Sequence, residues 1–175
     1  MRLLVLGGTQ FVGHAVVSAA LGLGWEVTTF NRGLSGADVA GVRVLRGDRA
    51  LTADLARLSA AGPWDAVIDT SGYVPREVLA SSGRLESVAA WYVFMSTVSV
   101  YRGWPLEPLS EASEVLYCPP DAGPDYGEDV EDGPTRLALC TAGMGRLRRD
   151  RRTPPSPHQR RWPLESSLTS WLDRG

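Results

Sequence analysis

Three glycines stand close together near the start of the chain. Gly7 and Gly8 end a short apolar run, and Gly13 follows inside a stretch with helical character. Gly7 would permit a tight turn, Gly8 would let the backbone approach a ligand, and Gly13 would allow a helix to pack closely on a strand. Backbone N–H groups at the start of a helix favour phosphate, because the helix dipole is positive there. The spacing therefore predicts a pyrophosphate site.

Strands and helices that would position this turn alternate along the first hundred residues. Short apolar runs predict strands over 2–6, 26–30, 42–46, 65–69 and 91–96, and the intervening patterns predict helices over 11–23, 52–60 and 75–89. The connection between residues 30 and 42 is rich in glycine and serine and is predicted to be mostly loop. Strands that alternate with helices favour a parallel, doubly wound sheet of the Rossmann-like α/β class.

This patterning stops in the second half of the chain. Six prolines between residues 105 and 134 interrupt every window long enough for a helix or a central strand. Apolar periodicity then vanishes, and the arginine, proline and serine content of 146–163 is typical of a disordered tail, with 164–172 as the one candidate helix. We therefore expect an incomplete nucleotide-binding domain over 1–136 and a largely disordered tail over 137–175.

Size and composition exclude several classes of protein. The 175 residues, 43% of them hydrophobic, suffice for one core. No apolar run approaches the roughly 20 residues of a membrane span, and the first strand runs directly into the glycine turn instead of a signal-peptide cleavage region. Cys118 and Cys140 lack metal-site spacing, so no metal site is predicted. A cytoplasmic protein without a membrane segment is expected.

Five ordered blocks of sequence resemble one protein family. They are Gly-Gly-Thr-Gln-Phe-Val-Gly at 7–13, Asn-Arg-Gly at 31–33, Gly-Asp-Arg at 47–49, Asp-Thr-Ser-Gly-Tyr at 69–73 and Ser-Thr-Val-Ser-Val-Tyr at 96–101. Together they resemble the extended and atypical extended short-chain dehydrogenase/reductases, which include NAD-dependent epimerases and dehydratases. The resemblance covers roughly residues 1–110. Gln10 departs from the usual pattern, which has a glycine there, and matches a variant found in RNA-binding and reductase-like relatives.

The resemblance implies which residues bind a dinucleotide cofactor. Asp48 and Arg49 would lie beside the adenine ring, although Asp48 could instead cap a helix. Thr70, Ser71 and Gly72 would line the nicotinamide half. The full set of predicted contacts comprises the glycine turn, the ends of the second and third strands and the end of the fourth: Gly7, Gly8, Thr9, Gln10, Phe11, Val12, Gly13, Asn31, Arg32, Asp48, Arg49, Thr70, Ser71 and Gly72.

The end of the second predicted strand bears on which nucleotide would bind. An acidic residue there binds the ribose hydroxyls of NAD, whereas a nearby arginine suits the 2′-phosphate of NADP. The strand ends Phe30-Asn31-Arg32, so no carboxylate occupies the position. We therefore predict NADP, with NAD as the alternative; the other role open to Arg32 is that of a solvated surface residue.

The residues that would perform chemistry are incomplete. By the resemblance, a tyrosine of Tyr-x-x-x-Lys moves a hydroxyl proton during hydride transfer, and a serine or threonine holds that oxygen. Thr97 matches the hydroxyl residue and Tyr126 is the candidate tyrosine, but Val130 takes the lysine position and the chain contains no lysine. Nearby carboxylates would disfavour the phenolate. An alternative alignment on Asp132 and Arg136 supplies only a carboxylate, which is a poor acid for an alkoxide.

Three functions follow from these observations. The favoured one is a catalytically impaired NAD(P)-binding domain of the epimerase/dehydratase class, with a premature or frame-shifted C-terminus as the explanation for the lost patterning near residue 137. The second is an active NADP-dependent reductase or epimerase on a sugar nucleotide or similar small molecule, using Thr97 and Tyr126. The third is an RNA-binding relative, although the arginines of 146–152 lack interleaved aromatic residues.

The predicted edge strand bears on assembly. If the sheet ends at 91–96, that strand exposes unpaired backbone groups unless another element or subunit covers it. A homodimer is therefore a further expectation, whereas nucleic-acid binding is not favoured, and the sequence does not identify the small-molecule substrate.

Overall fold

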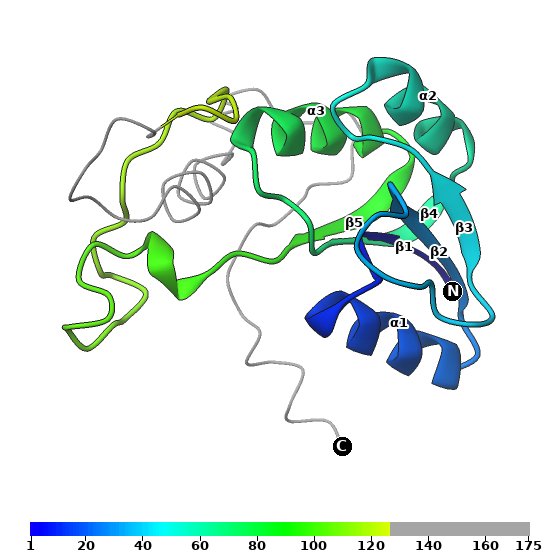
Figure 1. Cartoon of the computed structure of the whole chain (residues 1–175), viewed down its shortest axis with the longest axis horizontal. Coiled ribbons are helices and arrows are strands. Elements are labelled where there is room, and N and C mark those ends of the chain that lie inside the picture. Colours follow the sequence, from blue (N-terminus) through cyan, green and yellow to red (C-terminus); the bar gives the residue numbers. More distant parts are fainter. Residues whose placement is uncertain (127–175) are drawn as a thin grey trace, which may run out of the picture.

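A computed structural model describes residues 1–126, which contain one five-stranded parallel sheet (Figure 1). The strands are β1 (Arg2–Leu6), β2 (Glu26–Asn31), β3 (Arg43–Arg46), β4 (Trp64–Asp69) and β5 (Ala89–Phe94). Their order across the sheet is β3-β2-β1-β4-β5, so the chain winds outward from β1 in one direction and then in the other. The predicted Rossmann-like, doubly wound sheet is confirmed, and its topological switch point lies between β1 and β4.

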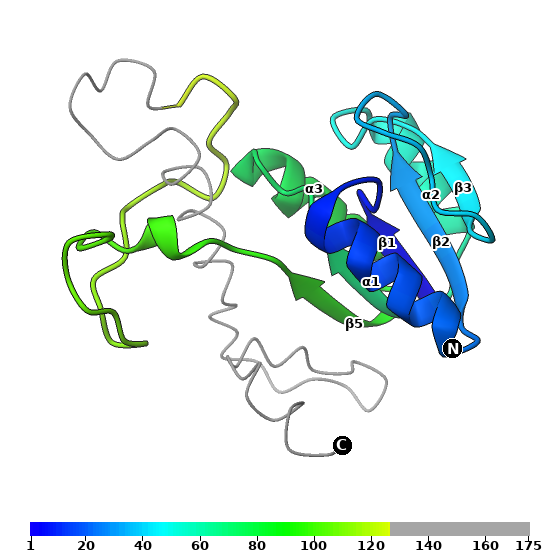
Figure 2. The same ribbon diagram turned by 60° about the horizontal axis from the view of Figure 1, so that its bottom comes forward.

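Helices cover both faces of the sheet (Figures 1 and 2). Helix α1 (Phe11–Gly22) lies on one face, and α2 (Thr52–Ala60) and α3 (Pro75–Leu85) lie on the other. Side chains of β1 alternate between the two layers, as a strand buried on both faces requires. Leu3 and Val5 pack in the cluster that contains Val17 of α1, whereas Leu4 packs with residues of α2 and α3.

Element boundaries differ from prediction around β5. The helix predicted over 75–89 ends at Leu85, and the strand predicted over 91–96 runs from Ala89 to Phe94. Ala89 pairs with Trp64, the first residue of β4, so sheet pairing places in the strand an alanine that was predicted to end the helix. Alanine has a high helix propensity, which tertiary pairing overrides here. The connection from β2 to β3 contains no helix, as predicted.

The segment after β5 forms a small structure of its own. A 3₁₀ turn, η1 (Val98–Val100), follows the strand, and a single antiparallel bridge joins Tyr101 to Val115. Around them, Leu116, Cys118 and Ala122 are buried in a cluster with Val100. The predicted tail of 137–175, its candidate helix and Cys140 lie outside the described residues. Among the described residues, no helix has the length and apolar character needed to cross a membrane.

Replacing a core residue of β1 should destabilise the fold far more than the same change in a loop. Leu4 is 0% exposed and Leu34 is 77% exposed. We expect Leu4→Ala to lower the free energy of unfolding by about 2–5 kcal/mol, through lost burial and the cavity left behind. Leu34→Ala should change it by less than about 0.5 kcal/mol. Urea unfolding followed by circular dichroism measures both, and equal losses would contradict the central place of β1.

Candidate functional site

The glycine turn joins the end of β1 to the start of α1. Gly7 and Gly8 have φ angles of 100° and 96°, a region that favours glycine. A methyl group on Gly7 would lie 2.7 Å from the Thr70 hydroxyl oxygen. On Gly8 it would lie 3.0 Å from a methyl carbon of Thr29, so the side-chain direction of Gly8 faces the protein interior. The predicted tight turn at Gly7 is confirmed, and Gly8 is additionally required by packing.

Gly13 lets the first turn of α1 approach the ends of two strands. A methyl group there would lie 2.9 Å from the backbone nitrogen of Gly8 and 2.7 Å from the hydroxyl oxygen of Thr70. Both distances are shorter than normal carbon contacts, and the first involves backbone that has little freedom to move. The predicted role of Gly13 in close helix-to-strand packing is confirmed.

The N-terminus of α1 has no side-chain cap. Its N-cap residue, Gln10, makes no side-chain capping bond, and the first turn holds no acidic residue. Phe11, the first residue of the helix, has a φ of 43° and a side chain that is 92% exposed. A bulky residue in this conformation is strained, and such strain is often found at binding sites. The uncapped N–H groups and the helix dipole together suit an anion.

Gln10 holds the loop after β2 against the glycine turn. Its side-chain amide donates a hydrogen bond to the backbone oxygen of Ser35. In the same place, a methyl group on Gly36 would lie 3.2 Å from the backbone oxygen of Thr9. The residue that departs from the family pattern thus has a specific local role, which the sequence did not reveal.

Asn31, at the end of β2, is the centre of a polar network. Its side-chain amide donates to Asp38 Oδ1 at 3.0 Å, and its side-chain oxygen accepts from the Gly33 backbone N–H at 2.8 Å and from Arg46. Asp38 also forms an ion pair with Arg46. The Arg46 guanidinium holds the pKa of Asp38 below its ordinary value, and Asp38 raises the pKa of Arg46.

This network brings the carboxylate of Asp38 to the end of β2, although the residues at that strand end include no Asp or Glu. Sequence reasoning missed Asp38 because it lies seven residues beyond Asn31, in a loop without regular structure. It missed Arg46 because only the residues after the third strand, Asp48 and Arg49, were assigned to the site, and Arg46 was counted as part of the strand. The signal that could have found them is the opposite charge of Arg46, at the end of β3, and Asp38, in the loop between β2 and β3.

Arg32 and Asp48 face each other across the ends of β2 and β3. Arg32 is exposed, and its guanidinium lies 3.9 Å from the Asp48 carboxylate. Asp48 also accepts a 2.9 Å hydrogen bond from the backbone N–H of Ala50. The N-cap of α2 is Leu51, which makes no side-chain capping bond. Asp48 therefore closes a turn before the helix, and the alternative assignment of Asp48 as the helix cap is wrong.

Arg49 points into the protein and forms a buried ion pair with Asp69. The side chains are 9% and 0% exposed, and two guanidinium nitrogens lie 2.9 Å and 2.7 Å from the two carboxylate oxygens. Arg49 also donates to the Ser81 hydroxyl of α3. Tyr92 of β5 donates to Asp69 at 2.7 Å, and burial together with Asp69 raises the pKa of this phenol. The guanidinium predicted beside adenine is thus engaged in the interior.

The turn after β4 packs against the glycine turn. The Thr70 hydroxyl donates to the backbone oxygen of Leu6 at 3.0 Å, and the Ser71 backbone N–H donates to Asp69 at 3.1 Å. A methyl group on Gly72 would lie 2.3 Å from the ring of Phe94. The structure therefore brings Thr70 and Ser71 next to the predicted phosphate turn, whereas their contact with nicotinamide stays a prediction.

The two predicted catalytic residues lie beyond β5. Thr97 is the N-cap of η1, and its hydroxyl oxygen accepts a hydrogen bond from the Ser99 backbone N–H at 3.3 Å. Tyr126 packs, partly buried, against the apolar cluster that contains Val100. Their roles in proton transfer stay predictions, and the alternative residues Asp132 and Arg136 lie outside the described part of the chain.

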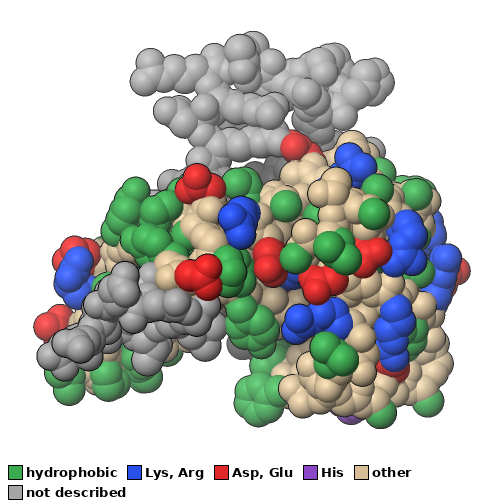
Figure 3. Space-filling view, turned by 45° about the horizontal axis from the view of Figure 1, so that its top comes forward, with side chains coloured by type: hydrophobic (Ala, Val, Ile, Leu, Met, Phe, Trp, Pro, Cys, Tyr) green, Lys and Arg blue, Asp and Glu red, His purple; other side chains and the backbone are tan. Residues whose placement is uncertain are grey.

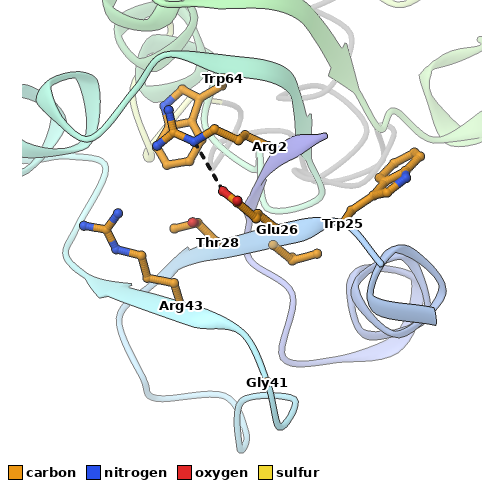
Figure 4. Close-up of a pocket in the computed structure, with 8 residues that line it drawn as sticks. Arg2, Trp25, Glu26, Thr28, Gly41, Arg43 and Trp64 are labelled. Carbon is orange, nitrogen blue, oxygen red and sulfur yellow. Dashed lines mark ion pairs between the residues drawn. The ribbon is translucent and has the colours of Figure 1, made fainter. Parts of the chain in front are cut away.

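A separate pocket of about 340 Å³ lies at the opposite edge of the sheet, where the strands begin (Figure 4). Arg2 lies over the ring of Trp64 at 5.3 Å from its centre and forms a 3.7 Å ion pair with Glu26. Its guanidinium also donates to the backbone oxygens of Pro63 and Ala61. These contacts of Arg2 are all with residues at or before the starts of β2 and β4, so Arg2 links the starts of the strands.

Comparisons with known proteins show similarity in structure. No family model matches the sequence, and no curated protein is similar enough to match it. The enzyme WbmG of Bordetella bronchiseptica, solved with NAD and UDP, is 16% identical, with a TM-score of 0.60 over 83% of this chain and 47% of that one. UDP-glucose 4-epimerase of Thermus thermophilus, solved with NAD, is 19% identical, with a TM-score of 0.60 over 82% and 48%.

A short-chain dehydrogenase/reductase superfamily protein of Agrobacterium tumefaciens, solved with bound NAD, is also similar. It is 19% identical, with a TM-score of 0.58 over 82% of this chain and 43% of that one. The fold is that of the epimerases and short-chain dehydrogenases. The resemblance inferred from sequence is thus confirmed at the level of the fold. This chain spans a little less than half the length of these three structures.

The pairing of Asp38 with Arg46 should make stability depend on pH in the acid range. A carboxyl group whose pKa falls on folding stabilises the fold above its ordinary pKa, here 3.8, and loses that contribution as the pH falls through the lower, folded value. We expect Asp38→Asn to lower the free energy of unfolding at neutral pH, and the difference from wild type to shrink below pH 3.8. Urea unfolding at a series of pH values measures it.

The control for this measurement uses the partner arginine. In an Arg46→Gln background, Asp38→Asn should produce a smaller pH-dependent difference, because the ion pair is already broken and the hydrogen bond from Asn31 remains. A difference that persists unchanged in that background would show that another group depresses the pKa of Asp38.

Proposed function

We propose that this chain binds a nicotinamide dinucleotide, as the nucleotide-binding domain of the epimerase/dehydratase class. The observation that carries the proposal is the uncapped start of α1 behind a turn whose conformation needs Gly7 and Gly8 and whose packing needs Gly13. Such a turn at the switch point of a doubly wound sheet is the usual site of a pyrophosphate. The similar structures were solved with NAD, which supports the same ligand class.

Each part of the cofactor has candidate contacts at this edge of the sheet. The pyrophosphate would contact backbone N–H groups of the glycine turn and of Phe11 and Val12. The adenosine would lie over the ends of β2 and β3, beside Arg32 and Asp48. The nicotinamide would lie toward the turn after β4. Arg49 would contribute through its backbone, because its guanidinium is paired with Asp69.

Two features at the end of β2 act in opposite directions on the choice of nucleotide. The exposed Arg32 guanidinium is 3.9 Å from Asp48, a weak pairing that a 2′-phosphate could replace. Asp38, close to Asn31, is a carboxylate that would repel that phosphate and accept hydrogen bonds from ribose hydroxyls instead. We propose NADP on the strength of Arg32, and NAD is the alternative that Asp38 favours.

We further propose that binding occurs without efficient turnover. The chain holds no lysine, so the cation that assists the tyrosine in this class is missing. An unassisted phenol with a pKa of about 10 is ionised to roughly 0.1% at pH 7. Proton transfer through Tyr126 and Thr97 would therefore be slow on any small-molecule substrate. A homodimer and a cytoplasmic location stay predictions of the sequence.

Charge on the face of the molecule shown in Figure 3 does not favour nucleic acid as the partner. On the face shown in Figure 3, acidic and basic side chains are interspersed over the described residues. A nucleic-acid surface would instead gather cations in a patch or stripe. The arginines of 146–152, which carried the RNA-binding hypothesis, lie outside the described residues.

Cofactor binding is tested by titrating the purified chain with NADPH and with NADH, using calorimetry and the shift in melting temperature. We expect saturable binding by wild type and a loss of at least about tenfold in affinity for Gly13→Ala, because the added methyl group displaces the glycine turn. Gly22→Ala, in the same helix, is the matched control, since a methyl group there meets nothing within 4 Å. Absence of binding by folded wild type to both nucleotides would refute the proposal.

Nucleotide selectivity is tested by removing the arginine at the end of β2. Arg32→Ala should weaken NADPH binding by about tenfold, the effect of losing one charge-assisted phosphate contact, and leave NADH binding nearly unchanged. Arg43→Ala, an exposed arginine at the start of β3 and so at the opposite edge, is the control. Tighter binding of NADH than NADPH by wild type would instead assign the cofactor to NAD and the ribose contact to Asp38.

A further inference from the structure

We infer that Arg49 and Asp69 are positioning residues that hold the two sides of the cofactor site at a fixed separation. The inference rests on the proposed dinucleotide binding and concerns residues that would not contact the cofactor through their own charged groups. It starts from the place of the pair in the fold. Arg49 precedes α2 and directly follows Asp48, whereas Asp69 is the last residue of β4 and directly precedes Thr70.

The sheet joins these two places only through two intervening strands. In the order β3-β2-β1-β4, two strands separate the end of β3 from the end of β4. With adjacent strands about 4.8 Å apart, the two ends are about 14 Å apart along the sheet. The side chain of Arg49 extends from the β3 side toward β4 and ends on the Asp69 carboxylate. The pair is thus a direct link across the width of the predicted site.

Each end of the link continues into predicted cofactor contacts. On one side, Asp48 lies 3.9 Å from Arg32 at the adenosine position. On the other side, the carboxylate of Asp69 accepts from the backbone N–H of Ser71, and Thr70 lies against the glycine turn. A displacement of the pair would therefore change the distance between the adenosine contacts and the contacts of the other half of the dinucleotide.

The ion pair of Arg49 and Asp69 is better suited to fix the relative orientation of the two loops than to stabilise the fold. A buried ion pair is often no more stabilising than apolar residues of the same size, because both charges lose their hydration. Here Arg49 Nε has no hydrogen-bond partner among the described residues, so the loss is not fully compensated. Two parallel hydrogen bonds between a planar guanidinium and a carboxylate nevertheless define direction as well as distance. Apolar packing would not define either so narrowly.

Neighbouring side chains restrict the pair further. Tyr92 of β5 donates to one carboxylate oxygen of Asp69 at 2.7 Å, and Ser81 of α3 accepts from Arg49. The carboxylate therefore receives hydrogen bonds from three elements, including the turn after β4 through Ser71. Rotation of the carboxylate would break several of these bonds at once, which makes the pair a rigid connection.

The test compares a whole dinucleotide with its adenosine half. Wild type, Arg49→Lys and Asp69→Asn are titrated with NADPH and 2′,5′-ADP, or with NADH and ADP if wild type prefers NADH. We expect both variants to lose at least about tenfold in affinity for the dinucleotide and less than about threefold for the fragment, because only the dinucleotide contacts both sides. Arg43→Lys, at an exposed arginine at the start of β3 and so at the opposite edge of the sheet, is the control and should change neither.

Fold and function are separated within the same experiment. A purely structural role would lower the folded fraction, measured by urea unfolding, and weaken both ligands by the same factor; equal losses or unchanged affinities would overturn the inference. If either single variant fails to fold, the double variant Arg49→Met/Asp69→Leu removes both charges and should keep the fold while showing the same selective loss. Wild type that binds neither ligand would refute the proposed function instead.

Discussion

The approach of α1 to the ends of β1 and β4 is the contact on which the candidate site depends. At Gly13 the helix lies so close to the backbone of Gly8 and to Thr70 that a single methyl group would force them apart. The same contact directs the uncapped first turn of the helix toward the edge where the strands end. Because parallel strands place all their carboxyl ends at one edge, the loops after β2, β3 and β4 meet there as well.

The strands, the helices and the parallel, doubly wound class of the sheet could be predicted, because strands and helices have local signals and their alternation indicates the class. Buried parallel strands appear as continuous apolar runs, and helices appear as the stretches between them. The error at β5 has the same origin, since Ala89 favours a helix and only its pairing with Trp64 of β4 makes it part of the sheet. The glycine turn was predictable because glycine tolerates the positive φ angles at Gly7 and Gly8 and the close packing at Gly13, and glycines at this spacing after a strand are typical of such a turn.

The polar contacts of the site could not be predicted in the same way. Asp38 and Arg46 are eight residues apart, and Arg49 and Asp69 are twenty apart, so each pair forms only when the sheet brings its loops together. Sequence reasoning assigned Arg49 to the cofactor because neighbours of Asp48 in the family line the adenine. In the structure the Arg49 guanidinium is buried and paired with the Asp69 carboxylate, so it is not available to contact a ligand at the surface.

Binding and catalysis place different demands on this chain. Binding needs backbone N–H groups, glycines and an arginine, all of which lie on or between the first four strands and are held by contacts within the described residues. Proton transfer needs a phenol whose pKa is lowered by a cation, and the sequence contains no lysine to supply it. Among the described residues, the phenol of Tyr92 donates to Asp69 of the Arg49–Asp69 pair, and burial raises the pKa of Tyr92. That phenol therefore serves the geometry of the candidate site, and the residues that would hold a dinucleotide need not include any that would complete the chemistry.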